Sequence, residues 1–261
     1  MYYSIVESGE SLPLGLADFI EAAGGSDVVY VGELHQVPEV LSFERDLVAG
    51  LADAGREPSV GLEMFNVLQQ RALDLYLAGA LSAEKFMELY ELSPEGFDLR
   101  RYMPLVDEAA GRRLRLIALN VPRDVASAVA LKGLDAAELE GLRLREEDVR
   151  EASRDYREML SDVYRRHPHE RISEENFILA QSIKDEMMAE TIRYCLVGGL
   201  ASSPLVVIAG KGHVEYGLGV PERVRGKMQR AGRPVTDVII TASYAGEAPG
   251  PGAADFFLLI P

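Results

Sequence analysis

The sequence contains a single cysteine, Cys195, among its 261 residues. One thiol cannot form an internal disulfide bond, and it cannot build a metal centre that needs several thiolate ligands. The cysteine content is therefore compatible with a reducing compartment, and any metal site would have to use other ligands.

Basic residues are scarce relative to acidic ones. Lysine and arginine total 27 against 42 aspartates and glutamates, so the formal net charge is −15 at pH 7. A field of this sign repels phosphate backbones and anionic lipid headgroups. We therefore expect no nucleic-acid partner and no adsorption to an anionic membrane.

Long apolar runs are also missing. No stretch approaches the roughly 20 apolar residues that a membrane-spanning helix requires. Residues 1–25 lack the basic region and apolar segment of a signal peptide, and they lack a lipobox cysteine. The sequence as given predicts a cytoplasmic protein without a membrane span, whereas removal of a leader from a longer precursor would fit a cell-envelope location.

Two frequent catalytic loops do not occur in the chain. It has no glycine-rich phosphate loop of either standard type and no Gly-x-Ser-x-Gly elbow, so a nucleotide cofactor is not indicated. The remaining composition is ordinary for a globular protein, with 48% hydrophobic and 26% charged residues. The length fits one large domain, or a domain that carries an insertion.

The most informative stretch is 27–35, with the sequence DVVYVGELH. Its β-branched run is apolar on both faces and predicts a buried strand, which a glycine ends. The same arrangement recurs at 205–213, LVVIAGKGH. Because ligands bind at the carboxyl ends of strands in open α/β sheets, we expect His35 and His213 to build one site.

Apolar patterns predict that strands and helices alternate along the rest of the chain. We expect further strands at 58–65, 114–119, 235–241 and 255–260, and helices at 12–23, 39–54, 67–78, 82–91, 99–110, 173–197 and 221–231. This order predicts an α/β fold with a mostly parallel β-sheet flanked by helices. Residues 126–171 show no strand pattern, so we expect a helical insertion there within a single domain spanning 1–261.

Polar side chains gather where four of the predicted strands end: Glu33 and His35, Glu63, Asn120 and Arg123, and His213. Imidazole and carboxylate groups suit a divalent metal that keeps one position open, so the candidate metal ligands are His35, Glu63 and His213. The alternative is that each group caps a strand end or forms a buried hydrogen bond.

The predicted helix at 173–197 presents another polar set. Gln181, Lys184, Asp185 and Met188 follow the spacing i, i+3, i+4, i+7, which places them on one helical face. This face could turn toward the site, or it could be a solvated stripe with an internal contact between Lys184 and Asp185.

Three other residues admit two interpretations each. Tyr216 follows His213 by three residues and is either a packing residue or a phenol ligand. His167 and His169 flank a proline within a charged stretch, which is typical of an exposed loop and could also bind a metal.

Five motifs, taken in order, resemble the ChaN family of bacterial haem-binding proteins. They are GELH at 32–35, GLEMF at 61–65, ALNVPR at 118–123, QSIKDEMMA at 181–189 and IAGKGHVEYGLGVP at 208–221. The resemblance spans about residue 5 to 241 and includes the paired Gly-x-x-His motifs of the wider group with Tiki, TraB and erythromycin esterase. It implies an α/β core with helical additions.

The resemblance also implies a ligand. ChaN proteins are often iron-regulated lipoproteins, and they hold haem at a dimer interface with tyrosine ligation. The resemblance therefore implies that this chain binds haem, that it acts in haem or iron uptake or trafficking, and that it forms a homodimer. Tyr216 is the candidate axial ligand because of its place beside His213. The other candidate cofactor-binding residues are His35, His213, Asn120, Lys184 and Asp185.

The wider group implies a different activity, a metal-dependent hydrolase of the esterase or peptidase type. In that interpretation His35, Glu63 and His213 hold a divalent ion, which lowers the pKa of its bound water toward about 7. Glu33 would be a general base or a residue that positions a metal ligand, and Arg123 an anion-binding or electrostatic group. A third interpretation is a module that binds a small polar ligand without chemistry, and the sequence leaves open whether the protein is an enzyme.

The chain departs from the family pattern at three places. Gln36-Val37 stands where the family usually has Asp-Asn, and Val40-Leu41 stands where a histidine pair usually follows. Lys184 replaces the usual arginine, which keeps the charge and loses the bidentate fork. Because the histidine pair at 40–41 is missing, we expect no histidine-rich pocket beside the predicted helix at 39–54.

Overall fold

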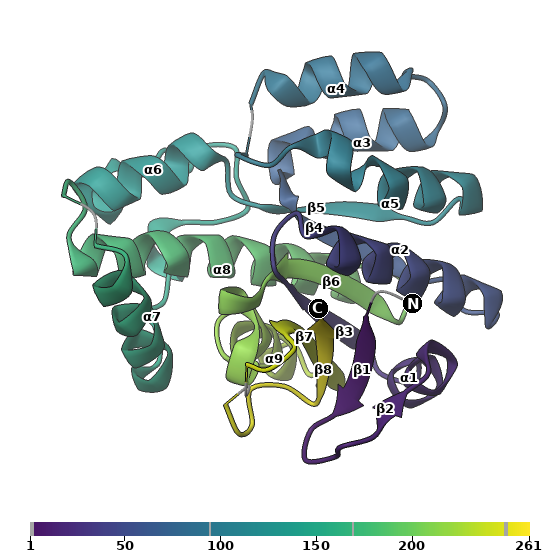
Figure 1. Ribbon diagram of the computed structural model, residues 1–261. Helices are drawn as coiled ribbons and strands as arrows, with labels where there is room; N and C mark the ends of the chain where they lie inside the picture. Colours follow the sequence, from purple (N-terminus) through teal and green to yellow (C-terminus); the bar gives the residue numbers. More distant parts are fainter. Residues whose placement is uncertain (1–2, 94, 169, 248–249) are drawn as a thin grey trace.

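The computed structural model describes residues 3–93, 95–168, 170–247 and 250–261 (Figure 1). These residues form an eight-stranded sheet with the order β2-β1-β8-β7-β3-β6-β4-β5. Its strands are β1 (Ser4–Glu7), β2 (Pro13–Leu14), β3 (Val28–Glu33), β4 (Ser59–Asn66), β5 (Leu116–Asn120), β6 (Leu205–Gly210), β7 (Asp237–Tyr244) and β8 (Phe256–Ile260).

The sheet is parallel from β8 to β5, and β1 pairs antiparallel with both β8 and β2. This confirms the α/β fold with a mostly parallel sheet. The sequence analysis missed β1 and β2, and it placed the start of the first helix too early. Only Ile5 of β1 is fully buried, and β2 has two residues, so neither strand carries a long apolar pattern.

Helices cover both faces of the sheet. They are α1 (Leu16–Ala23), α2 (Pro38–Asp53), α3 (Gln70–Leu77), α4 (Ala83–Glu91), α5 (Leu99–Arg112), α6 (Arg123–Lys132), α7 (Arg154–Arg166), α8 (Glu174–Val197) and α9 (Val220–Arg230). One core joins α1 to α5 with alternate residues of β3, such as Val29 and Val31. The other core joins α8 and α9 with Val28 and Tyr30 of the same strand. Side chains of β3 therefore alternate between two apolar layers, which explains its apolar run.

The two halves of α8 have different neighbours. Its second half packs on the sheet through residues such as Met188 and Ile192. Its first half supports α6 and α7 through Ala180, Ile183 and Ile178 (Figure 1). Within the described residues, none of the helices combines the length and apolar character that crossing a membrane needs.

The segment 126–171 is helical only toward its two ends. Between α6 and α7, residues 133–153 hold two short 3₁₀ turns, η2 (Leu134–Ala136) and η3 (Glu146–Asp148). The expectation of helices throughout this segment was therefore wrong in its middle. Glycines with positive φ lie at 133 and 141, and Leu144 is buried against α6 and α8 without a helical period. The assignment of this segment as an insertion stays a prediction.

Candidate functional site

The two Gly-x-x-His segments meet because β3 and β6 are neighbouring parallel strands. Their register pairs Glu33 with Gly210, so both chains leave the sheet at the same edge. A β-carbon added at Gly210 would lie 2.7 Å from His35 Nε2 and 3.5 Å from Glu63 Oε2. The glycine therefore makes room for the His35 ring beside the Glu63 carboxylate.

His35 forms a pair with the carboxylate that precedes it on β3. Its Nδ1 donates to Glu33 Oε1 at 2.7 Å, and the Tyr102 hydroxyl donates to the same carboxylate at 2.9 and 3.2 Å. The Glu33 side chain is buried, whereas the His35 side chain is 42% exposed. Burial lowers the pKa of His35, but the hydrogen bond to Glu33 and the charge of Glu63 outweigh this effect and raise it.

His213 lies in the short turn η4 (Lys211–His213) after β6, between two carboxylates. Its Nδ1 donates to Asp185 Oδ1 at 2.6 Å, and its Nε2 lies 3.4 Å from Glu63 Oε1. Burial lowers the pKa of His213, but the two carboxylates dominate and raise it to about 9. His213 is therefore a buried imidazolium at neutral pH.

Glu63 connects the two histidines with α8. It lies where the pairing of β4 with its neighbours becomes irregular, and its Oε2 accepts the Gly210 N–H at 2.7 Å. Lys184 Nζ lies 3.6 Å from Oε1. Burial raises the pKa of Glu63, but His213, Lys184 and His35 outweigh it and hold the pKa well below its ordinary value. The cluster thus contains a carboxylate whose charged form is favoured by its cationic neighbours, beside two imidazoles.

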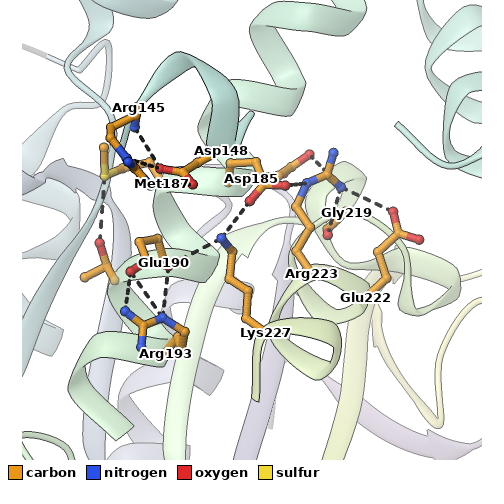
Figure 2. A network of polar contacts seen from close by, with 12 residues as sticks. Arg145, Asp148, Asp185, Met187, Glu190, Arg193, Gly219, Glu222, Arg223 and Lys227 are labelled. Carbon is orange, nitrogen blue, oxygen red and sulfur yellow. Dashed lines mark hydrogen bonds and ion pairs between the residues drawn. The ribbon is translucent and has the colours of Figure 1, made fainter. Parts of the chain in front are cut away.

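A second layer of buried charge lies between α8 and α9 (Figure 2). Arg223 Nη1 lies 4.0 Å from Asp185 Oδ2, and its Nε lies 3.3 Å from Glu186. Lys227 pairs with Glu186 at 3.0 Å and with Glu190 at 3.3 Å. The interpretation of Asp185 in a solvated stripe with a Lys184 contact is therefore wrong, because Asp185 is fully buried and bonds His213.

Three candidate residues lie apart from this cluster. Asn120 is buried, and its side-chain oxygen accepts the N–H of the following residue at 2.9 Å. Arg123 begins α6, and its guanidinium rests against Gly96. Tyr216 is 46% exposed and lines a separate cavity of about 430 Å³ with Arg225. His167 caps the end of α7, and His169 lies outside the described residues.

The donor set does not fit a divalent metal. In the part of the chain that the structure describes, no group of three or more His, Cys, Asp or Glu side chains is arranged to hold a metal ion. The chemistry explains why, since both ring nitrogens of His213 face carboxylates and Glu63 already binds an N–H and an ammonium. A metal would need lone pairs that these contacts occupy.

The sequence analysis missed Tyr102, Glu44 and Arg223. Glu44 is fully buried on α2, where burial and the Glu33 carboxylate raise its pKa well above the ordinary value. It was detectable, because it occupies the apolar stripe of its helix beside Phe43 and Leu47. Tyr102 and Arg223 gave no comparable signal, since their contacts depend on how α5 and α9 pack.

Comparisons with known proteins add a family and a fold. A family model described as "Haem-binding uptake, Tiki superfamily, ChaN" matches residues 19–224. The protein RETICULATA-RELATED 5, chloroplastic, of Arabidopsis thaliana is 26% identical over an alignment of 227 residues, and the match covers 78% of this chain and 30% of that protein. The chain thus spans less than a third of the length of that curated relative.

Two solved structures share the fold. One, described as cofacial haem binding to ChaN of Campylobacter jejuni, has a TM-score of 0.71 and 16% identity, and covers 99% of this chain and 97% of its own. The other, the type III effector HopBA1, has a TM-score of 0.56 and 11% identity at the same coverage. Such low identities show the common fold alone.

Proposed function

Because this chain belongs to the ChaN family of haem-binding uptake proteins in the Tiki superfamily, we propose that it binds haem and acts in haem or iron uptake or trafficking. The membership confirms the resemblance inferred from the five sequence motifs. The observation that supports the proposal best is the extent of the family match, which covers the sheet edge and both Gly-x-x-His segments.

Tyr216 is the residue that we propose as the axial ligand. A phenolate is an established protein ligand of haem iron. Its backbone has φ +60, a conformation that non-glycine residues seldom adopt, and its N–H donates to Ala253 O at 2.8 Å. The adjoining cavity of about 430 Å³ lies in the range of small-molecule sites, roughly 300–1,000 Å³. The open side of this cavity would be covered by a second copy in the homodimer that we propose.

Titration of the purified apoprotein with hemin tests the proposal. We expect a saturable shift of the Soret band in the wild-type protein. The Tyr216→Phe variant should weaken binding at least tenfold and lose the absorption bands of a phenolate-ligated ferric haem. Tyr194→Phe is the matched control. Tyr194 lies on α8, is 38% exposed, and packs its ring against the Arg143 guanidinium. Light scattering with and without hemin would measure the dimer.

The outcomes separate the parts of the proposal. A wild-type protein without saturable hemin binding would refute haem binding itself. Equal affinity and equal spectra for the wild type and Tyr216→Phe would leave haem binding standing and remove Tyr216 as its ligand.

A second function, hydrolysis without a metal, is favoured by one observation. His35 is half exposed while its Nδ1 is held by the buried Glu33, which is the arrangement of a general base that a carboxylate orients. An ester and peptide panel tests this candidate, with His35→Gln expected to abolish any turnover. Activity that survives in His35→Gln would refute it.

A further inference from the structure

A second cavity lies between α6 and α8, about 260 Å³ in volume. Its walls are one stripe from each helix: Arg123, Ala126 and Ala130 from α6, and Ala180, Gln181 and Lys184 from α8. The spacing i, i+3, i+7 on α6 and i, i+1, i+4 on α8 places each set on one helical face. Alanines on both helices leave the space, and charged residues stand at its edge.

The charges around this cavity favour an anion. Arg123 is exposed, and among the described residues its guanidinium forms no ion pair with a carboxylate. The guanidinium lies against Gly96, where an added β-carbon would come within 3.3 Å of Nη1. Lys184 contributes a second cation, 3.6 Å from Glu63. Among the residues that the structure describes, Glu95 is the one carboxylate in the lining, and it accepts hydrogen bonds from Asn66 Nδ2 and from the Arg123 backbone N–H.

The uncharged part of the lining is mostly apolar, with Ser127 and Gln181 as its polar residues. Ile172 and Phe177 line the cavity together with the alanines, so an occupant would meet both hydrocarbon and cations. Charge-assisted hydrogen bonds from a guanidinium suit a carboxylate, and the Gln181 amide can add a neutral donor. The volume is below the usual range for an intact cofactor, roughly 300–1,000 Å³, so it fits a short acid or one arm of a larger molecule.

We propose that this cavity is a carboxylate-binding site for an acid with an apolar body, and that Arg123 is its principal charge partner. Lys184 links the site to the polar cluster, because this residue lines the cavity and its ammonium lies 3.6 Å from Glu63 Oε1. The carboxylate has two sources: a free short-chain acid, or a propionate arm of haem. The second source rests on the proposed function, and the first does not.

Calorimetric titration with hexanoate tests the free acid, and hexanol, which lacks the charge, is the ligand control. We expect hexanoate to bind saturably and hexanol not to bind. Arg123→Gln should weaken hexanoate binding about tenfold or more, because a charge-assisted contact is lost. Ala130→Leu should do the same by filling the cavity. Lys132→Gln, at the far end of α6, should bind as the wild type does.

Hemin and hemin dimethyl ester test the propionate source. If propionate occupies the site, Arg123→Gln weakens hemin binding and leaves the dimethyl ester unaffected. Hexanoate binding without hemin binding would establish the site and refute the proposed haem function. The carboxylate site is overturned if neither hexanoate nor hemin distinguishes the wild type from Arg123→Gln, a variant at an exposed position that should fold normally.

Discussion

The buried imidazolium of His213 should make the stability of the protein depend on pH. Its pKa is raised from 6.5 to about 9 in the folded protein, mainly because Glu63 and Asp185 outweigh its burial. A group whose pKa is raised on folding stabilises the protein fully below its unfolded value, and loses this contribution as the pH rises through its folded value. This rise in the pKa corresponds to about 3 kcal/mol in the free energy of unfolding, which should be lost between about pH 6.5 and 9.

Urea unfolding of the wild type and of His213→Gln, followed from pH 6 to 10, measures this contribution. The wild-type free energy of unfolding should fall relative to that of the variant by about 3 kcal/mol over this range. The variant should be less stable at pH 6, because Asp185 and Glu63 then keep buried charges with fewer partners. His35→Gln is the matched control, since its ring is half exposed and should give a shallower difference.

Parallel curves for the wild type and His213→Gln between pH 6 and 10 would contradict the reasoning. They would mean that the imidazole keeps nearly its ordinary pKa in the folded protein, and that the contacts to the two carboxylates do not stabilise its charge as we assign. A direct reading of the His213 ring by NMR would then show titration near its ordinary pKa.

Three further predictions follow from the contacts. Gly210→Ala should displace the His35 ring and lower its pKa in an NMR titration, whereas Gly212→Ala, with open space around it, should not. Gln70→Ala should lower the free energy of unfolding by about 1–2 kcal/mol and promote aggregation, because this side chain bonds two backbone groups of the edge strand β5. Burial and the neighbouring carboxylate raise the Glu44 pKa, so the stability of the wild type falls as the pH rises above 4.5. Glu44→Gln removes this titration and should therefore raise the stability against urea at pH 8.

Much of the fold could be read from the sequence because the central strands are buried on both faces. Residues 28–31 of β3 and 205–209 of β6 are continuous apolar runs, and each predicted strand after residue 27 is present. The two N-terminal strands, β1 and β2, could not be found in this way. Pairing with β8 holds β1 in place, and this long-range contact leaves no periodic signal in four residues.

The candidate site was only partly visible in the sequence. Parallel strands end at one edge, so Glu33, His35, Glu63 and His213 could be expected together, and the structure places them there. Their roles in binding or catalysis stay predictions. Tyr102 and Arg223 could not be assigned, because nothing in a single sequence fixes how a helix packs over a strand end.

The repeated Gly-x-x-His pattern sets where the two imidazoles lie, but it does not set their chemistry. After β3 the chain turns outward through Gln36, at φ 62, and His35 remains half exposed with one carboxylate beside it. After β6 the chain enters a 3₁₀ turn beneath α8, and His213 is enclosed. Glu63 and then Asp185 of α8 raise its pKa. Equal motifs at equal sheet positions thus yield one half-exposed imidazole and one enclosed imidazole, and only the second contacts a carboxylate of α8.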